Sequence, residues 1–131
     1  MTLTYERMRR NISNHFKEKW DGITPAIYPN KEKDVGNAEE FVRLNILPSG
    51  GRQVAVGGRN FRREGIVVVQ IFVLQGTGQG TLGALEEKAT RIFEEARLPG
   101  IKIYEVGADY AGPDGRGYFQ SNIKARFRFD V

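Results

Sequence analysis

The sequence predicts an α+β fold, with a single mixed, mostly antiparallel sheet and two helices packed on it. The first observation is the segment from Ile66 to Leu74, which is apolar at every position except Gln70 and rich in β-branched residues. This composition is typical of a central strand with both faces covered. The second observation is a helical period just after this strand, in which six apolar residues share one narrow arc: Leu82, Leu85, Ala89, Ile92, Phe93 and Ala96. The third is the alternation of apolar and charged residues from 123 to 131, which indicates a strand with one face on the core.

Length and composition limit the classes of protein that need to be considered. The 131 residues fit one domain spanning 1–131, which is large enough for an independent core. The chain has no cysteine, which excludes disulfides, zinc–thiolate sites and thiol nucleophiles. No apolar run reaches the roughly 18 residues of a membrane span, and the first residues lack a signal-peptide core. We therefore expect a cytoplasmic product with no membrane partner. The net charge of +4 permits nucleic-acid binding without requiring it.

An amphipathic helix and two hairpins are expected before the central strand. Residues 5–20 place Tyr5, Met8, Ile12 and Phe16 on one helical face, and Asp21-Gly22 ends that helix. A short extended piece at 23–28 and a charged surface loop at 31–40 follow.

The strand Phe41–Leu47 is expected to end at Pro48, and Ser49-Gly50-Gly51 then supplies a turn that brings Arg52–Val56 back as its partner. A second turn at Gly57-Gly58 leads into the central strand, giving three antiparallel strands in a row.

After the central strand, Thr81 is a candidate N-cap for the second helix, Arg97 lies in its expected last turn, and Pro99-Gly100 stops it. A strand at 101–106 follows. The next segment, Gly107–Gly117, holds four glycines and a Pro-Asp-Gly turn, so it is predicted to be a mobile loop. We expect this loop to serve assembly and not folding.

The sequence Gly78-Gln-Gly80-Thr-Leu-Gly83 matches a G-x-G-x-x-G pattern, and Glu105 follows at the distance of a ribose-binding acid. The turn begins late after its strand and no βαβ units follow, so the favoured interpretation is a flexible connection that binds no dinucleotide. His15, the only histidine, has no accompanying triad motif and is interpreted as a helix-edge residue. The spacing of Asp109 and Asp114 lacks the ligand pattern of a calcium loop, so both are interpreted as turn-forming aspartates and no metal is predicted.

Two basic clusters remain as candidate contact surfaces. Arg59, Arg62 and Arg63 precede the central strand, and Lys124, Arg126 and Arg128 share one face of the last strand. The last-strand row is either solvated or faces an acidic or phosphate surface. An acidic cluster at Asp34, Glu39 and Glu40 could oppose the first basic cluster across a subunit contact.

The order of these segments resembles that of bacteriophage tail terminators, the minor tail protein family that includes the lambda-type tail terminator. The resemblance covers most of the chain and follows the first helix, the glycine turn and the helix with Phe93. Its short sequence pieces are Ile27-Tyr28-Pro29-Asn30, Phe41-Val42-Arg43-Leu44 running to Pro48, Arg63-Glu64-Gly65, Val69-Gln70-Ile71-Phe72 and Arg126-Phe127-Arg128-Phe129-Asp130.

The resemblance implies a non-enzymatic structural protein without a cofactor. Members of this family form a hexameric ring that caps the tail tube, ends its polymerisation and offers a surface to the head. It implies the chain itself, the tail tube protein and a head-completion protein as partners, with DNA only passing through the ring lumen. The expected location is the virion tail, after assembly in the host cytoplasm. Candidate contact residues are Arg59, Arg62, Arg63, Asp109, Asp114, Arg116, Lys124, Arg126 and Arg128. The alternatives are a nucleotide-binding domain using Gly78, Gly80 and Gly83, and a nucleic-acid-binding module using the last strand.

Overall fold

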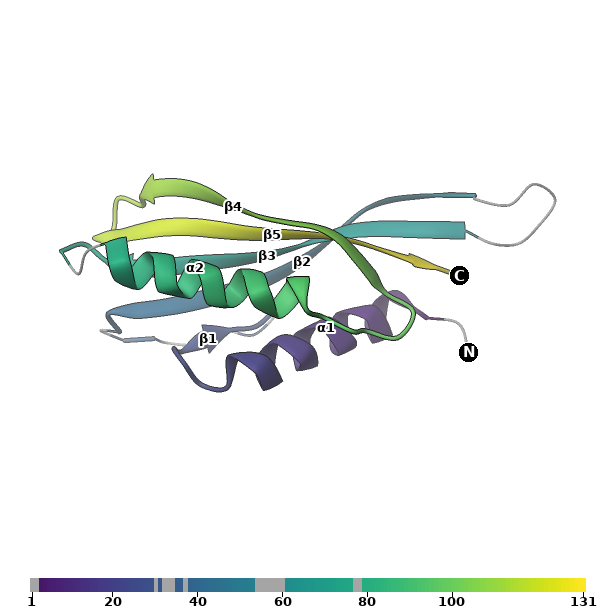
Figure 1. Ribbon diagram of the computed structural model, residues 1–131, viewed down its shortest axis with the longest axis horizontal. Helices are drawn as coiled ribbons and strands as arrows, with labels where there is room; N and C mark the ends of the chain where they lie inside the picture. Colours follow the sequence, from purple (N-terminus) through teal and green to yellow (C-terminus); the bar gives the residue numbers. More distant parts are fainter. Residues whose placement is uncertain (1–2, 30, 32–34, 37, 54–60, 77–78) are drawn as a thin grey trace.

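The computed structural model describes residues 3–29, 31, 35–36, 38–53, 61–76 and 79–131, and it confirms an α+β fold. Two helices lie on one five-stranded mixed sheet (Figure 1). The elements are α1 (Tyr5–Trp20), β1 (Ala26–Ile27), β2 (Glu40–Gln53), β3 (Phe61–Leu74), α2 (Gln79–Glu94), β4 (Lys102–Pro113) and β5 (Tyr118–Asp130). The strand order is β1-β2-β3-β5-β4; β1 runs parallel to β2, and the other neighbours are antiparallel.

The first helix forms where its apolar period predicts it. The hydroxyl of Thr4 accepts a hydrogen bond from the Arg7 backbone N–H, which caps the first turn. The helix ends at Asp21, whose φ of 48° lies in the left-handed region, and Gly22 continues that turn. The buried residues of α1 are Met8, Ile12, Phe16 and Trp20. They join the main core between the helices and the sheet.

The strand β3 is central, as predicted, but only one of its faces is fully covered. Val67, Val69 and Ile71 are completely buried against the helices. On the opposite side Ile66 and Val68 are only half-buried, because both helices belong to the same core and leave that side open. The prediction that both faces are covered was therefore wrong for most of the strand.

The predicted three-strand meander was wrong, because β2 does not turn back at Pro48. The strand continues through Pro48 with a bulge between Pro48 and Gly50, and Arg52 still pairs with Arg62 of β3. A proline is tolerated at this position because it lies next to a bulge. In addition, β1 pairs only with positions 42 and 43 of β2, so β1 needs no hydrogen bond from position 48. The turn expected at Gly57-Gly58 lies outside the described residues.

The glycine-rich segment predicted as a loop is mostly strand. β4 runs to Pro113 and pairs with β5 along its length, so only residues 114–117 connect the two strands. The segment forms a strand despite its glycines because its hydrogen bonds to β5, and not the strand propensity of its own residues, keep it extended. Two bulges, at Ile103/Glu105 and at Tyr110/Gly112, absorb the irregular sequence. Deleting this segment would therefore damage the sheet, contrary to the sequence-based expectation.

The turn between β4 and β5 is organised by one carboxylate. The Asp114 Oδ1 atom accepts hydrogen bonds from the backbone N–H groups of Arg116 (2.7 Å) and Tyr118 (3.1 Å). Gly115 and Gly117 have φ values of 81° and 94°, which a side chain would strain. The interpretation as a turn former is confirmed for Asp114 and was wrong for Asp109, which lies within β4 opposite Asn122.

Replacing Asp114 with alanine is expected to lower the free energy of unfolding by about 1–2 kcal/mol, because two backbone donors lose their acceptor. Hydrogen exchange at the Arg116 and Tyr118 amides should accelerate more than exchange in β3. Unchanged exchange at both amides would contradict this account of the turn.

The second helix buries the predicted face but occupies a different range. It begins at Gln79, so Thr81 is inside it and is not its N-cap, and it ends at Glu94, so Arg97 lies beyond it. Arg91 is the basic residue of its last turn. Leu82, Leu85, Ala89, Ile92 and Phe93 are buried as predicted.

Candidate interaction surface

The face of the sheet that the helices leave uncovered, here called the open face, carries most of the predicted contact residues. Paired residues on antiparallel strands point to the same side, so the register places Lys124 beside Val68, Arg126 beside Ile66 and Arg128 beside Glu64. Residues of β2 extend this face, and Leu47, opposite Ile66, is 52% exposed. The open face thus combines half-buried or exposed apolar side chains with charged ones.

Arg62 and Arg63, which the sequence grouped together, point to opposite faces. The Arg62 Nε atom donates to Asp130 Oδ1 at 3.0 Å, and its Nη2 atom donates to Asp130 Oδ2 at 3.3 Å. The Arg63 guanidinium instead lies over the Tyr5 ring, with 4.6 Å from Cζ to the ring centroid. The third member, Arg59, lies outside the described residues. The described part of the cluster is therefore not one patch.

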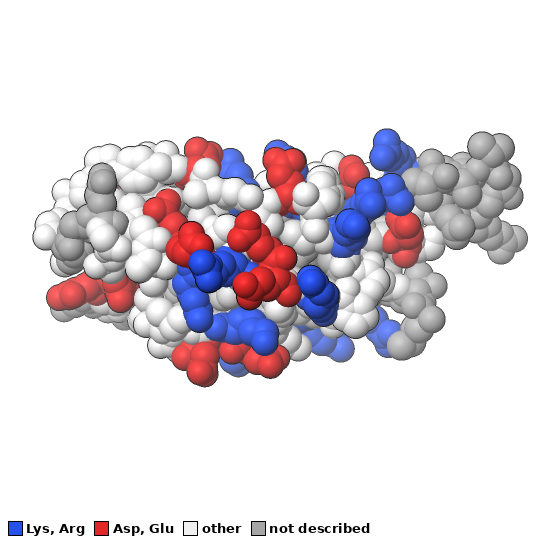
Figure 2. Space-filling model, in the orientation of Figure 1, with Lys and Arg blue, Asp and Glu red and all other residues white. Residues whose placement is uncertain are grey.

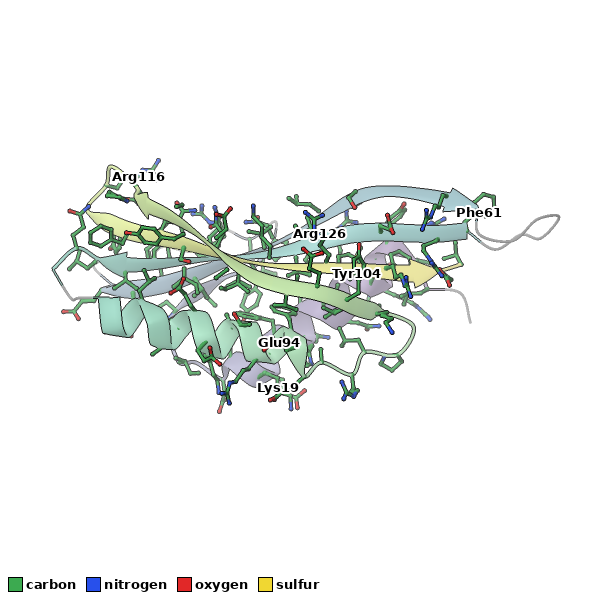
Figure 3. All side chains as sticks on the ribbon, turned by 45° about the horizontal axis from the view of Figure 1, so that its top comes forward. Lys19, Phe61, Glu94, Tyr104, Arg116 and Arg126 are labelled. Atoms are coloured by element: carbon green, nitrogen blue, oxygen red, sulfur yellow. The ribbon has the colours of Figure 1, made fainter. Side chains whose placement is uncertain are left out.

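The basic row on β5 has acidic partners on β4. Lys124 Nζ lies 3.1 Å from Asp109 Oδ2, and Arg126 Nε lies 3.8 Å from Glu105 Oε1. Arg128 lies 5.9 Å from the centroid of the Tyr104 ring. Figure 3 shows Arg126 and Tyr104 on the neighbouring strands β5 and β4. A continuous polyanion would have to displace two of these pairs, so the row is a weak candidate for binding nucleic acid.

The remaining candidates lie at the end of the β4–β5 hairpin. Asp114 is engaged in the turn, while Arg116 is exposed at its tip. In Figure 3, Arg116 and Phe61 mark opposite ends of the sheet. The structure thus unites Arg62, Lys124, Arg126, Arg128 and Asp109 on the open face and places Arg63 and Arg116 elsewhere.

The Arg62–Asp130 pair predicts an acid-sensitive contribution to stability. The hydrogen bonds from Arg62 hold the pKa of Asp130 below its usual value of 3.8. A carboxylate with a lowered folded-state pKa stabilises the fold above its unfolded-state pKa, and this contribution is lost as the pH falls through the folded-state value. Asp130→Asn should therefore be less stable than the parent at neutral pH. The difference should vanish in urea melts at pH values well below 3.8. A difference of equal size at every pH would contradict this assignment.

The glycine motif does not form a dinucleotide fingerprint in the described residues. Gly80 lies in the first turn of α2 and Gly83 lies deeper inside the helix; Gly78 lies outside the described part of the chain. The strand after the helix, β4, is not hydrogen-bonded to β3, because β5 separates them. Glu105, which a dinucleotide site would need as its ribose-binding acid, pairs with Arg126.

We therefore expect no binding of NAD or FAD. Calorimetric titration of the protein with either cofactor should give no heat beyond dilution. Micromolar affinity for either would contradict the structural interpretation of these glycines.

His15 connects the two helices. Its Nε2–H group donates to the Ile92 carbonyl oxygen at 3.0 Å, and its ring lies 6.4 Å from that of Phe93. A cleft of about 360 Å³ beside it is lined by Lys19, Lys88 and Arg91 among others. The histidine is at the helix edge, as predicted, and its hydrogen bond gives it a packing role. Within the described residues, no group of three His, Cys, Asp or Glu side chains is placed to hold a metal ion, and no helix is long and apolar enough to cross a membrane.

The sequence reasoning missed residues whose position depends on strand register. Arg52 was expected in a returning strand, but it extends β2 onto the open face opposite Arg62. Lys102 was passed over, and it lies opposite Arg128. The local sequence pattern does not reveal the position of either residue, because the bulges in β2 and β4 determine which residues pair across the strands. Figure 2 shows acidic and basic side chains intermingled on the helix-bearing side of the molecule, without one uniform patch.

No family model and no curated protein matches the chain. Solved structures do: 29 chains match it. One of them has a TM-score of 0.73 at 12% sequence identity, and the alignment covers 98% of this chain and 96% of that chain. At this identity the likeness shows the fold alone. The whole domain, including both helices, is thus an arrangement that another protein also adopts.

Proposed function

We propose that the protein is a structural subunit of a phage or prophage tail that caps the tail tube, ends its polymerisation and forms the head-joining surface. The observation that supports the proposal most is the open face. It exposes Leu47 and half-exposes Ile66 and Val68, on the side of the sheet opposite the helices. A sheet face that exposes apolar side chains among charged ones is the kind of surface that protein partners cover.

The ends of the sheet also suit contacts between copies. Glu39 and Glu40 lie at the start of β2, and Arg52 lies near its far end beside Arg62. Opposed charges at the two ends favour head-to-tail contacts, which produce a ring when the rotation closes. The expected partners are copies of this chain in a ring of six, the tail tube protein and the head-completion protein. Asp34 of the acidic cluster is outside the described residues.

The proposal is tested with purified protein and tail tubes assembled from tube protein. Light scattering should give a mass several times that of one chain, either alone or after tubes are added. Electron microscopy should then show a ring at one tube end and no further elongation. A chain that stays monomeric at all concentrations and leaves tube growth unchanged would refute the proposal.

Leu47→Glu serves as the matched surface variant, because Leu47 is exposed on the open face and its replacement leaves the core intact. It should abolish capping while changing the free energy of unfolding by less than about 0.5 kcal/mol. Ile23→Glu, at a similarly exposed apolar residue before β1, is the control and should cap normally.

A further inference from the structure

Two pairs of like charges face each other directly at one corner of the open face. The register sets Arg52 of β2 opposite Arg62 of β3, and Lys102 of β4 opposite Arg128 of β5. Like charges directly across a strand pair destabilise a sheet. We call these four residues the basic corner. In an isolated chain these two like-charge contacts lower the stability of the sheet.

Two acidic residues nearby, Asp130 and Glu64, offset only part of this charge, because the four cations outnumber them. Asp130 is engaged by Arg62 through two hydrogen bonds. Arg52, Lys102 and Arg128 form no ion pair with any residue that the structure describes. Arg62, Lys102 and Arg128 line a shared groove of about 440 Å³, to which Asp130 also contributes. The 46% exposed Tyr104 ring beside Arg128 adds an aromatic contact to the corner.

We propose that the basic corner is a docking site for an acidic segment of another protein, which places one carboxylate on each like-charge pair. The backbone midpoints of the two pairs lie about 12 Å apart, because they are separated by two strand spacings across the sheet and two residues along it. This distance is close to the rise of two helical turns, about 11 Å. An acidic helix with glutamates seven residues apart therefore fits the corner.

The arrangement favours a protein over a nucleic acid. Asp130 and Glu64 lie between the two cationic pairs in the sheet, so a continuous phosphate backbone would meet two carboxylates. Separate carboxylates at a fixed spacing avoid them. Two glutamates of α2 are engaged within the chain: Glu87 pairs with Arg91, and Glu86 accepts a hydrogen bond from the Ser121 hydroxyl. The inference does not depend on the proposed function, since it needs only the free domain.

The test uses two synthetic helical peptides of identical composition, one with glutamates seven residues apart and one with the same glutamates adjacent. NMR titration of the full chain with the first peptide should shift the amides of Arg52, Arg62, Lys102 and Arg128. The second peptide should bind about tenfold more weakly. Equal affinity for both peptides, or shifts confined to other residues, would refute the proposal.

The variant Arg52→Gln with Lys102→Gln separates binding from folding. It should lower the affinity for the peptide with spaced glutamates about tenfold. It should also raise the urea midpoint of unfolding, because each like-charge pair loses one member. Lys88→Gln, an exposed lysine on α2, is the control and should change neither. A lowered midpoint would mean that the cations are structural and would overturn the inference. The inference would also be overturned if a short DNA duplex bound the same residues more tightly than the spaced peptide does. Self-association of the chain that the double variant removes would overturn it too.

Discussion

Replacing Gly65 with alanine is expected to lower the free energy of unfolding by about 3 kcal/mol, the upper end of the usual cost of overpacking a core. A Cβ atom at this position would lie 2.4 Å from the Phe127 Cζ atom and 2.9 Å from the Leu47 carbonyl oxygen. Phe127 is completely buried, so its ring has no free space into which it can move. Urea unfolding followed by circular dichroism measures the effect.

Two variants make this expectation specific. Gly107→Ala, in β4, places its Cβ atom in open space and should be neutral or stabilising by a few tenths of a kcal/mol, because alanine reduces the entropy of the unfolded chain. In a Phe127→Leu background, the cost of Gly65→Ala should fall, since the clashing ring atoms are gone. An undiminished cost in that background would mean that the alanine acts on the strand backbone and not on the ring.

Replacing Phe93 with alanine is expected to destabilise the protein by about 3–5 kcal/mol. Phe93 is 1% exposed, and its ring stacks on Phe16 of α1 with the centroids 6.0 Å apart. Its removal opens a cavity at the contact between the two helices. Chemical denaturation is again the measurement.

Glu94→Ala is the control for this position. Glu94 is exposed on the neighbouring face of α2, where Figure 3 shows it in the helix layer with Lys19 of α1. The substitution should change stability by less than about 0.5 kcal/mol. Similar losses for the two variants would mean that the buried face of α2 is assigned incorrectly.

Helices and strands whose apolar residues repeat regularly could be predicted from the sequence. Strands that are held mainly by hydrogen bonds to a neighbouring strand could not. The alternation in β5 correctly placed Ile123, Ala125 and Phe127 in the core, and the apolar arc of α2 was correct at five of its six positions. The second half of β4 was missed because its glycines signal a loop locally, whereas a 13-residue neighbour, β5, holds it as a strand.

The same reason explains what was missed at the candidate surface. Lys124, Arg126 and Arg128 could be placed on one face from their spacing alone, and the register confirms it. Their partners Asp109 and Glu105 could not be identified, because Asp109 was assigned to a loop and the bulge at Ile103/Glu105 shifts the pairing by one residue. Charge neutralisation across strands depends on register, which composition does not reveal.

The strand order has a consequence for how the protein is made. β5 follows β4 in the sequence, yet it lies between β3 and β4 in the sheet. The hydrogen bonds between β3 and β5 therefore cannot form until all the other elements have been synthesised. During translation at roughly 5–20 residues per second, β3 therefore leaves the ribosome several seconds before its partner. Throughout this interval the apolar edge of β3 is open to pairing with another nascent chain. Synthesis slowed in the α2–β4 region should lengthen this exposure and increase the insoluble fraction, and co-expressed chaperones should act before β5 emerges.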